Sequence, residues 1–172
     1  GYVDDDNVPD FIVGGAVYSG EDGLLIYTVP AGSAVSGIGD VTGDERDDFI
    51  MGYYSSFTGF AKVYSGVSGE ELHHLPGISN NDAFGSSVPG IGDVDDDTVP
   101  DIIVGRRFAG YVYVYSGSTY LPLHTIIGGS SSGGSYRLGS AVSDAGDVNN
   151  DNYPDFIAGA PRYYSGFSTP NI

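Results

Sequence analysis

Four short apolar runs punctuate the chain, and each ends at a glycine. Such runs of β-branched and aromatic residues are typical of strands that are buried on both faces. Stretches that alternate apolar and polar residues follow them, as in 61–64 and 111–115. No stretch shows a clean helical period, so the pattern predicts an all-β fold with about four short strands in each unit. The four runs are Phe11–Val13, Phe49–Met51, Ile102–Val104 and Phe156–Ala158.

A polar segment rich in aspartate precedes each apolar run, and the four segments align with one another. They are GYVDDDNVPD (1–10), GDVTGDERDD (39–48), GDVDDDTVPD (92–101) and GDVNNDNYPD (146–155). A Tyr-Ser-Gly follows each run at 18–20, 64–66, 115–117 and 164–166, and a Gly-Ser lead-in precedes three segments. Self-similarity at a fixed period indicates stacked supersecondary units. The sequence therefore predicts one repeat domain over 1–172, with a shortened unit at about 1–31, units at about 32–84 and 85–138, and a truncated unit at about 139–172.

The charge of the chain is concentrated in these segments. The 172 residues include 23 Asp+Glu and 6 Lys+Arg, a formal net charge of −17, and 17 of the acids fall in the windows 2–10, 40–48, 93–101 and 147–155. So few basic residues argue against nucleic-acid binding. No apolar run reaches the roughly 18–20 residues of a membrane span, and the lack of cysteine excludes disulfides. Because the chain begins with Gly, we expect a processed chain or a fragment.

Oxygen donors occupy alternate residues of each window. In the third window they are Asp93, Asp95, Asp97, the backbone carbonyl of Val99 and Asp101, and in the fourth Asp147, Asn149, Asp151, the carbonyl of Tyr153 and Asp155. A tight turn brings such positions around one point, and hard oxygen donors in irregular geometry are what Ca²⁺ takes. Mg²⁺ prefers fewer protein ligands, and zinc favours His or Cys. The windows therefore predict calcium-binding loops.

The other two windows are less complete. The second offers Asp40, Thr42, Asp44, the carbonyl of Arg46 and Asp48, and the first offers Asp4, Asp6, the carbonyl of Val8 and Asp10. Tyr2 stands at the first position of the first window, and because a phenol is a poor calcium ligand, this site should be the weakest or be completed from elsewhere. An EF-hand is excluded because its twelfth residue is a bidentate Glu, whereas Val104 and Ala158 take that place here.

With these motifs at fixed phase, the units resemble FG-GAP repeats, the blades of the β-propeller head of integrin alpha subunits and of many secreted bacterial and archaeal proteins. Phe84-Gly85 in a lead-in and Gly159-Ala160-Pro161 after the fourth run match the two halves of the family's name. Other units depart from it, with Ala31-Gly32 or Leu138-Gly139 as lead-in and other residues in place of Ala-Pro at 53–54 and 106–107. The resemblance implies four-stranded blades, calcium in the hairpin loop between a blade's first two strands, and an extracellular setting.

Few residues outside the loops suggest chemistry, and no catalytic residue is expected. His73, His74 and His124 fall in corresponding outer hairpins, where solvated strand positions are expected. The stretch GGSSSGGS at 128–135 matches a nucleophile elbow only formally, so a flexible loop is expected there. Three segments that combine aromatic and basic residues would form either a binding rim or core and interface packing. They are Tyr53-Tyr54, Arg106-Arg107-Phe108 and Arg162-Tyr163-Tyr164.

The number of repeats is too low for a closed ring. A closed propeller needs about 4–8 blades, and partial blades leave strand edges that can pair with another chain. The chain is then a piece of a longer propeller, shares a ring with other copies, or joins copies head to tail into a fibre. We expect a non-catalytic, extracellular, calcium-stabilised structural or adhesion protein that acts by assembly or by binding an extracellular protein or glycan. The alternative is a carbohydrate-binding or accessory propeller module of a secreted hydrolase or lyase.

Overall fold

The computed structural model describes residues 2–4, 6, 8–54, 58–131, 134, 135 and 137–161. In this part of the chain every regular element is a β-strand, so the predicted all-β fold is confirmed. The strands are β1 Phe11–Val13, β2 Ala16–Tyr18, β3 Leu25–Thr28, β4 Ala34–Gly39, β5 Asp48–Tyr53, β6 Phe60–Tyr64, β7 Glu71–Pro76, β8 Gly90–Ile91, β9 Asp101–Arg106, β10 Tyr111–Tyr115, β11 Pro122–Ile127, β12 Ser130–Ser131, β13 Gly134–Ser135, β14 Ala141–Gly146 and β15 Asp155–Gly159.

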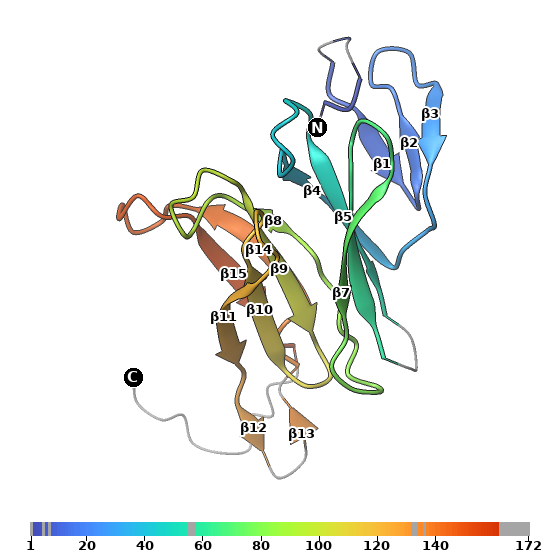
Figure 1. Ribbon diagram of the computed structural model, residues 1–172. Helices are drawn as coiled ribbons and strands as arrows, with labels where there is room; N and C mark the ends of the chain where they lie inside the picture. The colour runs from blue at the N-terminus through green and yellow to red at the C-terminus, as the bar shows by residue number, and fades with distance from the viewer. Residues whose placement is uncertain are drawn as a thin grey trace.

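Two four-stranded antiparallel sheets form the middle of the molecule (Figure 1). One has the strand order β4-β5-β6-β7 and the other β8-β9-β10-β11, so each is an up-and-down meander. A three-stranded sheet, β1-β2-β3, comes before them in the chain, and a two-stranded sheet, β14-β15, comes after them. The predicted four strands per unit thus hold for the two middle units, and the sheets of the described residues do not close into a ring.

The first three units share a register shift at the same place in the repeat. The shift falls at Val17/Tyr18, at Val63/Tyr64 and at Val114/Tyr115, directly before the Ser-Gly of each Tyr-Ser-Gly segment. Such an irregularity bends the strand locally, so the turn that follows is aimed in the same direction in each unit. The fourth Tyr-Ser-Gly, at 164–166, lies outside the described residues.

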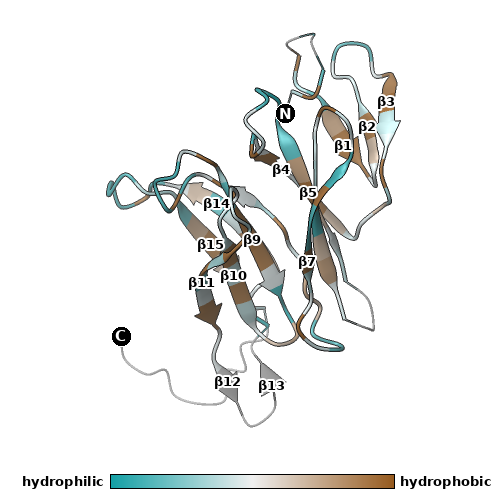
Figure 2. Ribbon diagram, viewed as in Figure 1, coloured by the Kyte–Doolittle hydropathy of each residue, from teal (hydrophilic) through white to brown (hydrophobic). Residues whose placement is uncertain are grey.

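The apolar runs of the middle units contribute to two cores at once. In β5, Phe49 and Met51 pack with Val17 of the first unit, whereas Ile50, on the opposite face, packs with Ile102 of the third unit. β5 and β9 are therefore buried along almost their whole length, as a continuous apolar run predicts. Figure 2 shows hydrophobic residues along these strands and hydrophilic residues in the loops at the strand ends.

The outer runs do not match the prediction of burial on both faces. Phe11 and Val13 of β1 are 50% and 63% exposed, and Ile157 of β15 is 66% exposed. The residues that correspond to Ile157 in the middle units, Ile50 and Ile103, are fully buried. The prediction was wrong for β1 and β15 because no sheet of the described residues covers their outer faces.

The low-complexity stretch at 128–135 also differs from the expected loop. Ser130–Ser131 and Gly134–Ser135 pair antiparallel as a short hairpin, β12-β13. The pairing is made by the backbone, so a composition of small residues does not prevent it. No helix follows the stretch in the described chain, which agrees with the rejection of a nucleophile elbow.

Candidate metal sites in the aspartate loops

The aspartate segments lie at one end of the sheets. They form the loops between β4 and β5, between β8 and β9 and between β14 and β15, so each joins the first two strands of its unit. The first segment leads directly into β1. Figure 1 shows each of these loops at the upper end of its own sheet, and Figure 2 shows their hydrophilic character. The predicted position, between the first two strands of a blade, is where the three later loops lie.

The ninth residue of each window anchors its loop. Asp101 is fully buried, and its carboxylate accepts hydrogen bonds from the Val94 amide at 2.8 Å and from the Gly117 amide at 2.9 Å. Burial raises the pKa of Asp101, against the effect of these two amides. The carboxylate thus joins its loop to the Tyr-Ser-Gly turn. Equivalent contacts are made by Asp10 with Val3 and Gly20, by Asp48 with Val41 and Gly66, and by Asp155 with Val148.

The glycine of Tyr-Ser-Gly is required by a close approach to the loop. A Cβ atom on Gly117 would lie 1.8 Å from the carbonyl oxygen of Pro100, and one on Gly66 would lie 2.0 Å from that of Asp47. The turn can pack on the loop in this way only with glycine at that place. In the sequence the motif marks the repeat, but its role as the support of the aspartate loop is visible only in the structure.

The first residue of a window organises the backbone of the loop. The Asp93 carboxylate accepts hydrogen bonds from the amides of Asp95, Asp97 and Thr98 at 3.2, 3.1 and 2.7 Å. Although desolvation acts in the opposite direction, these amides lower the pKa of Asp93, so it is ionised at neutral pH. Amides of the corresponding loops donate in the same way to Asp40 and Asp147.

Carboxylates converge in groups of three in two of the four loops. The acids of the second and fourth windows do not form such a group. The first window, expected to be the weakest because of Tyr2, brings three carboxylates together without that residue. The order of affinities among the loops stays a prediction. Among the described residues the two groups, each with oxygen atoms within 4.8 Å of one another, are Asp4, Asp6 and Asp10, and Asp93, Asp95 and Asp101.

The third loop carries several negative charges, and the ion pairs of Lys62 and Arg106 in the described part of the chain lie outside it. Desolvation by the surrounding loop, together with the neighbouring carboxylates of Asp97 and Asp93, raises the pKa of Asp95. None of the lysines and arginines in the described ranges forms an ion pair with an acid of this loop. The donors are oxygen atoms only, so a hard divalent cation fits this loop and a soft metal does not.

Neighbouring loops are hydrogen-bonded to one another. The Tyr153 hydroxyl donates to the Asp96 carboxylate at 3.1 Å, which joins the fourth loop to the third. The Asp47 amide donates to the Tyr2 carbonyl at 3.0 Å, which joins the second loop to the first. The geometry of a loop therefore depends on the adjacent unit as well as on its own residues.

The three histidines lie outside the carboxylate groups. His74 on β7 and His124 on β11 are exposed, as predicted for solvated strand positions. His73 is half-buried and stacks on Tyr120 of the next unit, with ring centroids 4.2 Å apart. Burial, with a contribution from His74, lowers the pKa of His73. The prediction that His73 is solvated was wrong, because the next unit covers this part of the strand, which would be solvated in an isolated unit.

At the other end of the sheets, the two halves of the FG-GAP motif meet across units. A Cβ atom on Gly52 would lie 1.9 Å from the carbonyl oxygen of Gly85, and one on Gly105 would lie 2.2 Å from that of Gly139. The glycine that ends one run thus packs against the lead-in glycine of the next unit. Phe84, beside Gly85, is fully buried between the second and third units.

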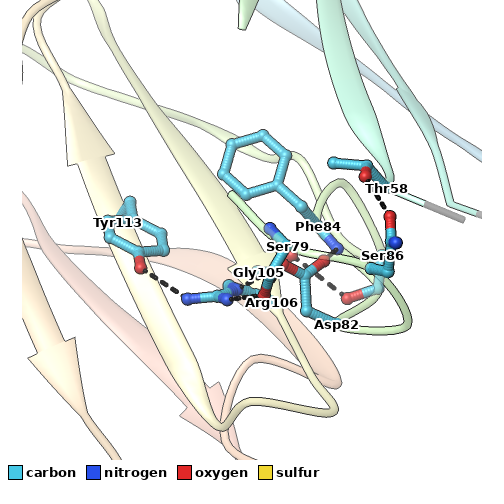
Figure 3. Close-up of polar contacts among 9 residues, drawn as sticks. Thr58, Ser79, Asp82, Phe84, Ser86, Gly105, Arg106 and Tyr113 are labelled. Atoms are coloured by element: carbon cyan, nitrogen blue, oxygen red, sulfur yellow. Dashed lines mark hydrogen bonds and ion pairs between the residues drawn. The ribbon is translucent and has the colours of Figure 1, made fainter. Parts of the chain in front are cut away.

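A buried ion pair at this end was not signalled by any sequence motif (Figure 3). Arg106 Nε donates to Asp82 Oδ2 at 2.7 Å, and the two side chains are 11% and 4% exposed. Arg106 also donates to the hydroxyl groups of Tyr113 and Ser79. The Phe84 amide donates to Asp82 at 3.0 Å, so the network fixes the lead-in loop of the third unit to β9. The one signal in the sequence was that Asp82 is an isolated acid in the polar lead-in before Phe84-Gly85.

The aromatic and basic segments divide between their two predicted roles. Tyr53 stacks within its own sheet and Arg106 belongs to the buried network, so both serve in packing. The Arg107 guanidinium carbon lies 4.7 Å from the centre of the Tyr54 ring and 4.6 Å from that of the Phe108 ring, in a half-buried cluster in which Phe108 is exposed. The third segment, 162–164, lies outside the described residues.

Taken together, short antiparallel sheets stacked in series, with an acidic loop between the first two strands of each, define a repeat protein of the β-propeller class. A sequence model of the FG-GAP repeat family matches residues 140–170. Integrin alpha-3 of Cricetulus griseus is 30% identical over 146 residues, which are 75% of this chain and 14% of that protein. Integrin alpha ina-1 of Caenorhabditis elegans is 30% identical over 179 residues, 82% of this chain and 16% of that protein. Integrin alpha-8 of Mus musculus is 27% identical over 157 residues, 82% of this chain and 14% of that protein.

The chain carries FG-GAP repeats of the integrin alpha type, and its four-stranded sheets are β-propeller blades. It spans 14–16% of the length of these three relatives. Within the described ranges, no helix has the length and apolar character needed to cross a membrane.

Proposed function

We propose that this chain is part of an extracellular, non-catalytic adhesion or structural protein whose blades are stabilised by Ca²⁺. The observation that carries the proposal is the convergence of three carboxylates in each of two aspartate loops. The similarity to integrin alpha chains supports an adhesive role outside the cell. Calcium at the millimolar level found there suits loops of this kind.

In this proposal each loop holds one ion through oxygen atoms at alternate positions. The hydrogen bonds of the loop support this arrangement, because backbone amides already orient the carboxylate at the first position of the window and the Tyr-Ser-Gly turn orients the carboxylate at the ninth. The proposed ligands are Asp4, Asp6, the Val8 carbonyl and Asp10; Asp40, Thr42, Asp44, the Arg46 carbonyl and Asp48; Asp93, Asp95, Asp97, the Val99 carbonyl and Asp101; and Asp147, Asn149, Asp151, the Tyr153 carbonyl and Asp155.

The ion stabilises the folded chain because it neutralises carboxylates that repel one another at close range. The unfolded chain separates these charges and binds the ion weakly, so ion binding favours the folded state. A free calcium concentration of about 100 times the Kd adds about 2.7 kcal/mol of folding free energy for each independent site. The loops also contact one another, so the ions hold together adjacent blades as well as single hairpins.

The partners of the chain in this proposal include further blades of its own kind. The outer faces of β1 and β15 expose Phe11, Val13 and Ile157, whereas the corresponding residues of the middle units are buried by a neighbouring sheet. We propose one repeat domain over 1–172, in units of about 1–31, 32–84, 85–138 and 139–172, whose open faces dock on other blades. These blades belong to the same polypeptide or to another copy.

Thermal unfolding with Ca²⁺, with Mg²⁺ and with EGTA tests the calcium proposal. We expect the melting temperature to rise most with Ca²⁺ and to fall on chelation. Asp95→Ala should abolish the ion at the third loop. The same variant should not destabilise the calcium-free chain. The pKa of the Asp95 carboxyl is raised in the folded chain, which means that ionised Asp95 is unfavourable there. Glu21→Ala, which removes an exposed acid outside the windows, is the matched control. Equal calcium stoichiometry in Asp95→Ala and Glu21→Ala would refute the site.

A further inference from the structure

The end of the sheets opposite the aspartate loops has the reverse charge. We call it the distal end; it comprises Arg106 at the close of β9 and the described residues of the connections that follow β5, β7, β9 and β11, at 54, 58–59, 77–89, 107–110, 128–131, 134–135 and 137–140. These stretches contain Arg106, Arg107 and Arg137 against a single acid, Asp82. A six-residue strand such as β9 spans about 20 Å, which separates this end from the acidic loops by more than the Debye length of about 8 Å at physiological salt.

Arg107 is the basic residue of the described chain that has no polar partner. Its neighbour Arg106 donates to Asp82, Tyr113 and Ser79, and Lys62 pairs with Glu71. Among the described residues Arg107 has no hydrogen-bond or ion-pair partner, and its Nε atom is buried without an acceptor. Leaving a buried charged donor unpaired is unfavourable, so packing among the described residues does not explain Arg107.

Aromatic rings hold the Arg107 guanidinium in place. The guanidinium carbon lies 4.7 Å from the Tyr54 ring of the second unit and 4.6 Å from the Phe108 ring of its own unit. Arg137, near the end of the third unit, lies 5.1 Å from the same Phe108 ring. We call Tyr54, Arg107, Phe108 and Arg137 the arginine ladder. It joins the second and third units, and Phe108 remains 41% exposed.

Such an arrangement favours a particular type of ligand. Rings that stack on a guanidinium leave its N–H groups, which point outward in its plane, for an acceptor. A carboxylate matches two of these donors at once, and such charge-assisted pairs are the strong ones. Both rings already face guanidinium groups, so the cluster presents polar arginine edges rather than free ring faces for stacking a sugar. Arginine and aromatic residues are also the types enriched at the centres of protein interfaces.

We propose that the arginine ladder at the distal end binds carboxylate side chains of an acidic segment in a partner polypeptide. The Arg107 guanidinium donates hydrogen bonds to one carboxylate lying in its plane, and Arg137 adds a second positive charge alongside it. The strongly acidic remainder of the chain restricts such a partner to this end. The inference names a partner for the proposed adhesive role and rests on that role, but it does not depend on the calcium loops.

Fluorescence anisotropy with a labelled peptide of alternating Glu and Gly tests this inference, with a Gln-Gly peptide of equal length as the uncharged comparison. The full chain is used with Ca²⁺ at about 0.15 M NaCl, where charges beyond about 8 Å are screened. We expect binding of the Glu peptide alone. Arg107→Gln should weaken it about tenfold or more, and Arg107→Lys should restore only part of the affinity. Lys62→Gln removes the same charge outside the ladder and should change nothing.

Nitrogen-edited NMR of the unmodified chain provides a readout that needs no variant. The Arg107 Nε–Hε signal should shift on addition of the Glu peptide and not on addition of the Gln peptide. The proposal is overturned if the Glu peptide does not bind, or if Arg107→Gln binds it as well as the unmodified chain. It is also overturned if heparin or polygalacturonate shifts the Arg107 signal and the Glu peptide does not. If melting depends on calcium but the peptide does not bind, only the present inference fails. If the peptide binds but melting does not depend on calcium, only the calcium proposal fails.

Discussion

The ion pair between Asp82 and Arg106 offers the sharpest test of how the units are joined. Asp82→Asn keeps the size of the side chain and one acceptor oxygen, removes the charge, and replaces the other acceptor oxygen with an NH2 donor. The pair is 4% and 11% exposed and its N–O distance is 2.7 Å, so the variant leaves a buried guanidinium without its counter-ion. Removing one member of a buried pair costs about 3–5 kcal/mol. Because Arg106 retains Tyr113 and Ser79, we expect a loss near the lower value, about 3 kcal/mol.

Urea unfolding followed by circular dichroism measures this loss, and thermal unfolding should show a fall of about 6–12 °C. Arg106→Met should rescue part of the loss when it is combined with Asp82→Asn, with a coupling energy of about 1 kcal/mol or more. Glu71→Gln is the matched control, because the Lys62–Glu71 pair has a similar distance but is 22% and 39% exposed. It should cost less than about 1 kcal/mol. Equal costs for the two acids, or no coupling between Asp82 and Arg106, would show that burial is not what makes this pair matter.

The same variant has a defined pH dependence. Burial acts to raise the pKa of Asp82, but the amides of Phe84 and Ser79 and the Arg106 guanidinium outweigh it and lower that pKa. A carboxyl whose pKa is lower in the folded chain contributes stability above its unfolded pKa and loses it as the pH falls through the folded value. The difference in unfolding free energy between the unmodified chain and Asp82→Asn should therefore be constant at neutral pH and shrink below about pH 4.

Two further predictions concern the loop support and the open faces. Gly117→Ala places a Cβ atom 1.8 Å from the Pro100 carbonyl oxygen, so it should cost about 3 kcal/mol or more and weaken calcium binding at the third loop. Gly37→Ala, whose Cβ atom meets nothing within 4 Å, should cost less than about 1 kcal/mol, and equal urea midpoints would contradict this account. In calcium, light scattering should give a mass above the 17.9 kDa of one chain, and Ile157→Asp should lower it. A monodisperse 17.9 kDa species would contradict association between copies.

Much of the fold could be predicted because the repeat carries its own local signals. The apolar runs became strands, the three later aspartate segments became the loops between the first two strands of their units, and Tyr-Ser-Gly marked the next turn. Each of these depends on residues close together in the chain. The hairpin at 128–135 was missed because its backbone pairing leaves no apolar pattern.

The candidate site was predictable in its composition but not in its geometry. Alternate oxygen donors indicated all four loops, yet among the described residues carboxylates converge in groups of three in the first and third loops alone. Spacing along the chain does not determine how closely side chains approach, since amides and adjacent loops also compete for the carboxylates. The weak binding predicted for the first loop from Tyr2 stays a prediction. The contacts of Asp82 with Arg106 and of Arg107 with Tyr54 join separate units, and no local pattern records them.

The sequence by itself determined that the chain is all-β, that its units repeat, and that its acids gather at one place in each unit. These properties follow from residue types at short spacing, where the backbone geometry of strands and turns is the same in any fold. The tertiary structure alone decided which apolar faces are covered, which carboxylates converge, and which arginine is neutralised. Those outcomes depend on contacts between residues in different units, and their energies come from burial and from short charge separations that exist only when the units are stacked.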